Sequence, residues 1–348
     1  MYKVGFQTGQ AVDAHRPHWS GDGPRPLRWS AWYPAVHSAV ESPFGVPPAA
    51  PLFWMGSVAP GADLSPDLPG YPVVLLSHGT GGTAASLGWL ACRLAADGCV
   101  VIGVDHHGNT ASEPYRPEAF LCWWDRPRDL TAILDLMTTD PRFTGRLDLD
   151  RVAAVGFSIG GHTVLSLAGA ITDMRLFNDW AADRAALGGP REFPDIADHV
   201  APLLRDSAAF RAAWERQSEP LGDPRVARVV ALAPAPPVRS FSAASLGGLA
   251  RVAVTIATGE ADDEAPFDAC SVWLRDLLPH CTLCSLGPAV GHYQLLGEGT
   301  RLGLRVMPEI FADPPGVDRR AVHAAASGIV LAALRGHGSP GPAAKSRS

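Results

Sequence analysis

The stretch Val152-Ala153-Ala154-Val155-Gly156-Phe157-Ser158-Ile159-Gly160-Gly161-His162 is an apolar run that ends at a serine between glycines. Its β-branched part predicts a buried strand, and the residues after it follow a helical pattern. Between them stands Gly-x-Ser-x-Gly, in which small residues let the strand and helix backbones crowd around an exposed serine. We interpret Ser158 as a nucleophile. The alternative is a structural turn, because glycine patterns also arise by chance in a chain with 36 glycines.

Strands and helices alternate on both sides of this stretch. Residues 72–77 and 100–104 are nearly continuous apolar runs, typical of strands buried on both faces of a parallel sheet. The other expected elements are strands at 2–8, 27–33, 226–233, 252–258 and 281–286, and helices at 84–97, 127–137 and 319–334. Such alternation predicts an α/β fold whose central sheet is mostly parallel and flanked by helices, with the first two strands antiparallel.

Three stretches interrupt the alternation. Residues 105–125 are expected to form a long loop, and residues 172–223 a helical, lid-like insertion; long insertions between core elements are often lids or binding loops. The Pro-rich connection 35–70 has no assigned place, and its apolar centre at 52–55 either covers the pocket or packs on the surface. We expect one domain over residues 1–335 and a flexible tail at 336–348.

Composition excludes several classes of protein. The 348 residues carry a formal net charge of −6 and only 18% charged residues, so no basic face for nucleic acid is expected. The amino-terminal residues lack the pattern of a secretion signal, and no apolar run reaches membrane-spanning length. We therefore expect a cytoplasmic protein that acts on a small molecule.

A Cys-x-x-Cys pair, Cys281 and Cys284, follows His280 and is a weak indication of zinc or redox chemistry. An extended segment would place the two sulfurs on opposite faces, and no second ligand pair follows. The neighbouring His106 and His107 also make a metal site conceivable, but such a site needs several converging ligands with supporting carboxylates. We expect neither a metal nor a cofactor.

A serine nucleophile needs a base, and the base needs a carboxylate that orients it. Loops after two later strands supply both: four acids lie between residues 260 and 264, and His292 follows the last core strand. Asp262 is our first choice for the acid, Asp263 the second and Glu260 the third. The alternative for these acids is to cap the helix that follows them.

The negative charge that develops on an attacked carbonyl needs two N–H donors held in place beforehand. We expect them to be the backbone N–H groups of Ile159, directly after Ser158, and of Thr80, in the glycine-rich loop 78–82. His78 is expected to anchor this loop. The candidates to line the substrate pocket are His78, His106, Trp124 and Tyr293.

These motifs resemble the serine α/β-hydrolases of the platelet-activating-factor-acetylhydrolase-like and predicted dienelactone hydrolase group. The matching segments are LSHGTGG at 76–82, VDHHGNT at 104–110, DRPRDL at 125–130 and VGFSIGG at 155–161. The similarity spans most of residues 28–296, apart from the Pro-rich stretch and the insertion. It implies the α/β-hydrolase fold, the triad of Ser158, Asp262 and His292, and Thr80 with Ile159 as oxyanion donors.

The chain departs from that group in two features. True dienelactone hydrolases use a cysteine nucleophile, whereas this chain has Ser158, and many members carry a secretion signal, whose pattern the amino-terminal residues lack. The order of serine, acid and histidine along the chain predicts a serine hydrolase that cleaves a small to medium, largely apolar carboxylic ester through an acyl-enzyme. The alternatives are an amide or thioester hydrolase, an acyltransferase or cyclase that uses the same acyl-enzyme, and a non-catalytic binding protein on this scaffold.

Overall fold

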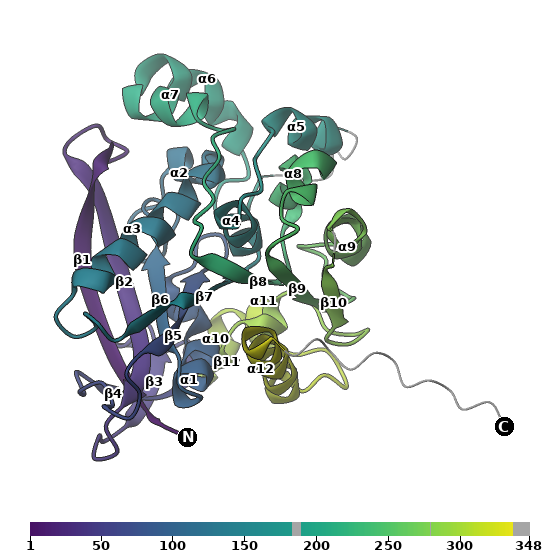
Figure 1. Cartoon of the computed structure of the whole chain (residues 1–348). Coiled ribbons are helices and arrows are strands. Elements are labelled where there is room, and N and C mark those ends of the chain that lie inside the picture. The colour runs from purple at the N-terminus through teal and green to yellow at the C-terminus, as the bar shows by residue number, and fades with distance from the viewer. Residues whose placement is uncertain (183–188, 279, 337–348) are drawn as a thin grey trace.

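A single twisted sheet organises the chain in the computed structural model, which describes residues 1–182, 189–278 and 280–336 (Figure 1). Within these ranges the sheet has eleven strands, in the order β10-β9-β8-β7-β5-β6-β2-β1-β4-β11, with β3 paired to β4. The strands are β1 (Lys3–Pro17), β2 (Pro24–Ala35), β3 (Ser42–Val46), β4 (Phe53–Pro60), β5 (Tyr71–Ser77), β6 (Val100–Asp105), β7 (Leu147–Phe157), β8 (Val226–Leu232), β9 (Ala253–Thr258), β10 (Thr282–Ser285) and β11 (Glu298–Gly299).

The strand order places the functional loops together. Strands β6, β5, β7, β8, β9 and β10 are mutually parallel, whereas β1 and β2 form an antiparallel pair at one side. After β5 the chain crosses to β6 on one side and then to β7 on the other, so the direction of winding reverses at β5. The carboxyl ends of strands at such a reversal are where open α/β sheets bind their ligands. Ser158 follows β7 at this point, and the loop 78–82 follows β5.

Helices cover both faces of the sheet (Figure 1). They are α1 (Gly88–Ala96), α2 (Pro117–Leu121), α3 (Arg126–Thr139), α4 (Ile159–Leu167), α5 (Met174–Ala182), α6 (Val200–Asp206), α7 (Ala208–Glu215), α8 (Ala243–Gly247), α9 (Trp273–Leu277), α10 (Arg301–Val306), α11 (Pro308–Phe311) and α12 (Arg319–Arg335). In the described ranges no helix combines the length and the apolarity that crossing a membrane requires. The predicted α/β fold with a mostly parallel, helix-flanked sheet is confirmed.

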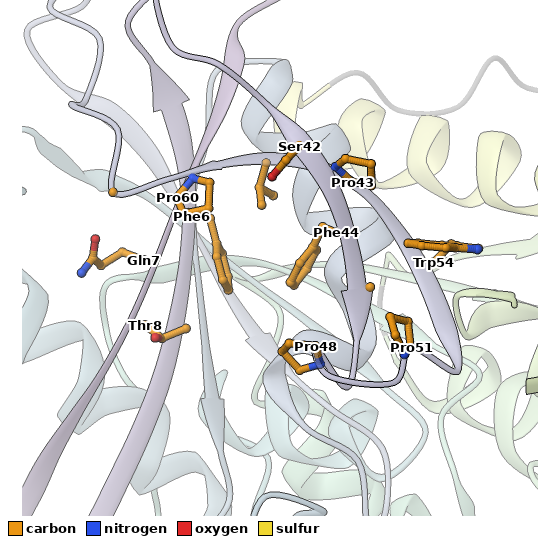
Figure 2. Close-up of a pocket in the computed structure, with 13 residues that line it drawn as sticks. Phe6, Gln7, Thr8, Ser42, Pro43, Phe44, Pro48, Pro51, Trp54 and Pro60 are labelled. Atoms are coloured by element: carbon orange, nitrogen blue, oxygen red, sulfur yellow. The ribbon is translucent and has the colours of Figure 1, made fainter. Parts of the chain in front are cut away.

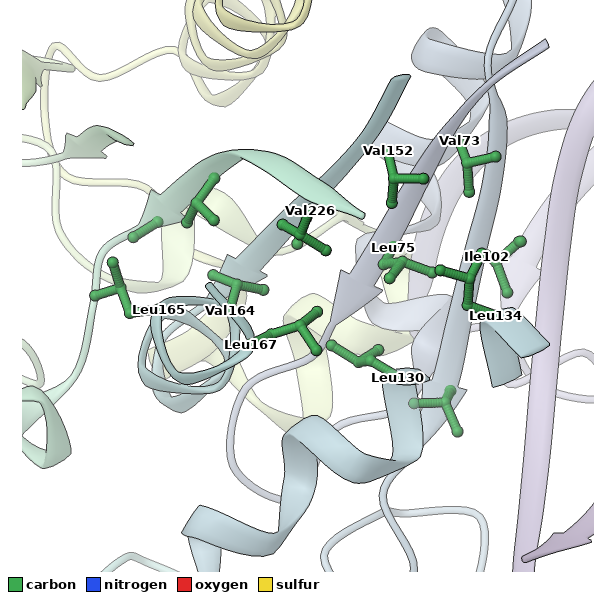
Figure 3. Packing of buried hydrophobic residues seen from close by; sticks show 14 of the residues in the cluster. Val73, Leu75, Ile102, Leu130, Leu134, Val152, Val164, Leu165, Leu167 and Val226 are labelled. Atoms are coloured by element: carbon green, nitrogen blue, oxygen red, sulfur yellow. The ribbon is translucent and has the colours of Figure 1, made fainter. Parts of the chain in front are cut away.

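Two apolar clusters form the core, one on each face of the sheet. On β5, Val73 and Leu75 pack with α3 and α4, whereas Val74 and Leu76 pack with α1 and α12 (Figure 3 shows the first cluster). Burying one such side chain stabilises the fold by roughly 1.5–3 kcal/mol. The same alternation holds at the edge strand β10: Cys281, directly before the strand, packs against the first cluster, and Cys284, within it, packs against the second. The prediction that these sulfurs point to opposite faces is confirmed.

The insertion packs over the turn at Ser158. A third apolar cluster joins Met174 of α5 and Phe210 of α7 to Trp123, Trp124 and Ile159. The stretch 105–125, expected to be a loop, contains α2 and a 3₁₀ turn at Trp123–Asp125, which supply the surface on which the insertion rests. Residues 183–188 of the insertion and the predicted tail beyond residue 336 lie outside the described ranges.

The Pro-rich stretch 35–70, which the sequence left without a place, extends the sheet. Its strands β3 and β4 form an antiparallel pair, and β4 also pairs with β1 and β11. Met55 is buried in the core, whereas Trp54 is 46% exposed beside a surface hollow of about 690 Å³ (Figure 2). Five strand spacings separate β4 from β7, roughly 24 Å. The stretch therefore does not cover Ser158.

Candidate active site

Ser158 stands at a strained turn between β7 and α4. Its backbone has φ 57° and ψ −122°, a conformation that L-residues rarely adopt. A Cβ added at Gly156 would lie 1.9 Å from the Gly160 carbonyl oxygen, and one added at Gly160 would lie 2.1 Å from the Ser77 oxygen. Both positions therefore require glycine. The turn leaves Ser158 only 8% exposed.

Replacing Gly156 with alanine should lower the free energy of unfolding by more than about 3 kcal/mol, because backbone atoms on both sides of the turn must move apart. Urea denaturation followed by tryptophan fluorescence measures the loss. Gly328→Ala is the matched control: this glycine is exposed within α12, and an added Cβ meets nothing within 4 Å. Gly328→Ala should raise the free energy of unfolding by up to about 1 kcal/mol. A Gly156→Ala variant as stable as the wild type would contradict the close approach.

His292 and Asp262 lie in contact. The structure places His292 Nδ1 2.7 Å from Asp262 Oδ2, and an ionised carboxylate can only accept, so Nδ1–H donates. The other oxygen, Oδ1, accepts from Ala265 N–H at 2.7 Å, as a capping acid would. Asp263, by contrast, is exposed, and Glu260 accepts from the Ser285 hydroxyl. Of the three candidate acids, Asp262 is the one that meets the histidine.

His292 lies beside the nucleophile turn. Its ring centroid is 4.7 Å from that of Phe157, the residue before Ser158. Among the described residues, no hydrogen bond joins the Ser158 hydroxyl to His292. Catalytic hydrogen bonds in ligand-free structures are often long and tighten only when substrate binds. With Nδ1 bonded to Asp262, His292 Nε2 has the lone pair that can accept a proton.

The loop 78–82 lies against the turn. An added Cβ at Gly79 would come within 3.3 Å of the Ser158 Cβ. Gly81 has φ 64°, and its N–H donates to Asn109 Oδ1 at 2.7 Å. His78 Nδ1 bonds the Gly79 carbonyl at 2.7 Å. Because a trans peptide points its N–H opposite to its carbonyl, this bond also sets the direction of the Thr80 N–H. Ile159 is the first residue of α4, so its N–H has no acceptor within the helix.

A buried polar network supports the loop from behind. The His106 backbone N–H donates to His78 Nε2 at 3.1 Å, which leaves the proton on His78 Nδ1. The His106 ring bonds Asp129 Oδ2 at 2.7 Å and the Ser77 hydroxyl at 2.9 Å. Burial lowers the pKa of His78 well below its usual value and that of His106 to about 4, so both rings are neutral at pH 7.

Two arginines complete this network. Arg16, at the end of β1, donates to both Asp125 and Asp129. Burial works against the Asp129 anion, but its pairing with Arg16 and the hydrogen bond from His106 lower its pKa well below the ordinary value. Arg126 donates to the His78 carbonyl oxygen, while its Nε and Nη1 have no partner among the described residues. Burial lowers the pKa of Arg126 to about 9.

Three of the four predicted pocket residues are not at a pocket surface. His78, His106 and Trp124 are at most 2% exposed, and their ring nitrogens bond to protein groups; Trp124 Nε1 donates to the Ala213 carbonyl. These side chains support the loop and the insertion from inside. The sequence does not show whether a histidine or tryptophan is buried, and these three residues were therefore interpreted as lining the pocket. Tyr293 alone remains partly exposed next to His292.

Sequence reasoning gave no site role to Asn109, Arg16 and Asp129. For Arg126 it left two alternatives open, lining or bracing the pocket and packing on the surface. A signal was present for three of the four: Asn109 lies in the matching segment 104–110, and Arg126 and Asp129 in 125–130. Arg16 had no such signal. Within the described ranges, no group of three or more histidine, cysteine or acidic side chains is placed to hold a metal ion.

Comparison with known proteins gives matches to parts of the chain. The family described as platelet-activating factor acetylhydrolase, isoform II, matches residues 55–119. Cutinase est1 of Thermobifida alba is 36% identical over 107 residues, which are 30% of this chain and 33% of that protein. Bis(hydroxyethyl) terephthalate hydrolase of Streptomyces coelicolor is 33% identical over 98 residues, 28% of each chain. The chain thus spans about a third of the length of the curated relatives it matches.

A solved structure resembles the chain as a whole. The ferulic acid esterase of Streptomyces cinnamoneus superposes with a TM-score of 0.64, covering 99% of this chain and 94% of its own. At 20% sequence identity this likeness establishes the fold alone. The chain thus has the fold of that esterase, and its matched segment is similar to the family described as platelet-activating factor acetylhydrolase, isoform II.

Proposed function

We propose that this protein hydrolyses small to medium, largely apolar carboxylic esters through an acyl-enzyme. Ser158 is the nucleophile, His292 the base, Asp262 the carboxylate that orients it, and the N–H groups of Thr80 and Ile159 form the oxyanion hole. The observation that carries the proposal is the strained turn, which presents Ser158 at the reversal point of the sheet while His292 stands beside it. The hydrolase names of the partial relatives agree with this chemistry.

The reaction follows from the positions of the groups. Ser158 Oγ attacks the ester carbonyl carbon while its proton passes to His292 Nε2, and the carbonyl electrons move onto the oxygen that faces the two N–H donors. When that oxyanion collapses, the bond to the alcohol breaks and His292 returns the proton to the leaving oxygen. Water then attacks the acyl-serine and gives a proton to His292. When the bond to Ser158 Oγ breaks, His292 returns the proton to that oxygen and the carboxylic acid product departs.

Asp262 acts by orientation. Its bond to Nδ1 holds the imidazole with Nε2 as the acceptor, and its negative charge stabilises the imidazolium that forms in each half-reaction. The second bond, from Ala265 N–H, holds the carboxylate itself in place. The insertion also packs Phe210 and Met174 into one apolar cluster with Ile159, which gives the turn at Ser158 apolar surroundings that suit an apolar ester.

A fluorophosphonate probe tests the proposal directly, because it reacts with serines that a neighbouring base activates. The probe should label this protein at one site, and peptide mass spectrometry should place the label on Ser158. A panel of p-nitrophenyl esters graded by acyl length should then show turnover that labelling abolishes. A folded protein that the probe leaves unlabelled would favour the non-catalytic binding protein.

The same panel separates hydrolysis from acyl transfer. With an added primary alcohol or amine, a hydrolase yields mainly the free acid, whereas a transferase yields mainly the new ester or amide. The product ratio at a fixed concentration of acceptor decides between them. We expect the acid to dominate.

A further inference from the structure

A short segment of the insertion, residues 191–194, contacts both the loop that carries Thr80 and the loop that carries His292. On one side it meets the loop 78–82, named here the oxyanion loop: a Cβ added at Gly81 would lie 2.8 Å from Glu192 Oε1 and 3.0 Å from the Tyr115 hydroxyl. Tyr115 in turn donates to the Gly81 carbonyl at 2.9 Å. The Glu192 carboxylate therefore rests on the residue that follows Thr80.

On the other side the segment meets the residue that follows His292. Arg191 Nη2 donates to the Tyr293 hydroxyl at 3.2 Å, and this hydroxyl donates to Glu264 Oε1 at 2.7 Å. Arg191 also lies 3.7 Å from the exposed Glu309. The segment thus bridges two loops: Glu192 contacts the loop that carries Thr80, and Arg191 contacts the loop that carries His292.

The segment and its contacts carry more negative than positive charge. Glu192 and Glu264 contribute two carboxylates, and Arg191 contributes one cation, which reaches Glu264 through the Tyr293 hydroxyl. Burial is the main cause that raises the pKa of Glu192; the charge of Arg191 lowers this pKa, and the charge of Glu264 raises it by a smaller amount. Arg191 also pairs with Glu309, and its side chain is half exposed to solvent. It therefore offsets the charges of Glu192 and Glu264 only in part.

Glu192 is also within reach of the reacting atoms. It contacts Gly81, two residues from Gly79, whose added Cβ would lie 3.3 Å from the Ser158 Cβ, so the Glu192 carboxylate is at most about 17 Å from that Cβ. A substrate carboxylate within about 12 Å of Glu192 would be repelled by about 1.4 kcal/mol at an effective dielectric constant of about 20, which changes binding about tenfold. A free carboxylate near the scissile ester of a substrate would meet this repulsion, and an uncharged group would not.

We propose that Glu192 is a specificity-determining residue that makes the site select uncharged esters over esters that carry a nearby carboxylate. The inference rests on the proposed ester hydrolysis and adds a substrate class to it. It also explains how product leaves: hydrolysis creates a carboxylate beside Glu192, and the same repulsion favours its release. A diester is therefore cleaved once readily, and its anionic half-ester slowly.

Dimethyl glutarate and monomethyl glutarate test this, because they share the acyl chain and leaving group and differ by one charge. Hydrolysis is followed at pH 8 by chromatography of the products. The wild-type protein should favour the diester in kcat/KM by at least about tenfold. Glu192→Gln, which keeps the shape of the side chain, should raise kcat/KM for the monoester about five- to tenfold and change that for the diester by less than about twofold.

Two variants control the interpretation. Asp195→Asn removes a charge from an exposed side chain three residues along the chain and should leave the preference unchanged. Arg191→Gln removes the cation and should widen the preference for the diester. An active Glu192→Gln variant with the wild-type preference would overturn the inference while leaving ester hydrolysis intact. A wild-type protein that cleaves no ester of any kind would instead refute the proposed function.

Discussion

Replacing Ser158 with alanine is expected to reduce kcat for a short p-nitrophenyl ester by about 10⁴- to 10⁶-fold, to the level that binding and the oxyanion donors alone provide. The variant loses the only atom that becomes bonded to the acyl group, and the neighbouring groups cannot replace it. Alanine removes one oxygen and keeps the Cβ, so the turn itself should persist. Steady-state kinetics at saturating ester measure the loss, and far-UV circular dichroism checks the fold.

Ser166→Ala is the matched control for that variant. Ser166 lies on α4, eight residues after Ser158, and is 3% exposed, so the change removes a buried hydroxyl from the same helix. Its activity should stay within about threefold of the wild type. If Ser158→Ala retained comparable activity, the nucleophile would have to be another group and the proposed mechanism would fail.

Replacing Asp262 with asparagine is expected to lower kcat by about 10⁴-fold. The amide can donate to His292 Nδ1 where the carboxylate accepts from it, so the imidazole turns its proton toward Ser158 and Nε2 can no longer act as the base. The amide also lacks the charge that stabilises the imidazolium. Kinetics with the same ester measure the effect.

Asp263→Asn is the control for this variant, because Asp263 is exposed and adjoins Asp262 in the chain. It should retain activity within about threefold. The two variants also decide between the two acids. A larger loss of kcat in Asp263→Asn than in Asp262→Asn would assign the orienting role to Asp263 and require the loop to rearrange around it.

The core of the fold was predictable from the sequence because its strands are buried on both faces. Residues 72–77 and 152–157 are almost wholly apolar, and the structure places both runs within neighbouring central strands. The candidate site was predictable to the same extent, since each of its three main groups follows a core strand: Ser158 after β7, Asp262 after β9 and His292 after β10. A strand end is a local feature that a sequence displays.

The Pro-rich stretch could not be placed because its partners are distant in the chain. Strand β4 pairs with Gly5–Phe6 of β1 and with β11, which begins at Glu298. Short strands interrupted by Pro and Gly give no clear alternation, and nothing local identifies which edge they extend. The pairing energy that places them arises only when the whole sheet is assembled.

The residues that support the site were missed for a related reason. His106 and Trp124 were interpreted as lining residues, since a histidine or tryptophan in a loop looks the same in sequence whether it faces a ligand or the interior. Arg16 pairs with Asp129, 113 residues later, and no local pattern reveals such a contact. The same limit applies to Glu192, whose role depends on where the insertion crosses the oxyanion loop.

The contact of Arg16 with Asp125 and Asp129 also bears on how the chain folds. The hairpin of β1 and β2 is synthesised before α3, and Arg16 finds its buried partners only after more than a hundred further residues have been made. Until then the guanidinium remains hydrated, and the backing of the oxyanion loop cannot form. Contacts of such long range slow folding, because the chain between them must lose its freedom before they stabilise anything. We therefore expect catalytic competence to appear late in refolding, after most of the helical signal has returned.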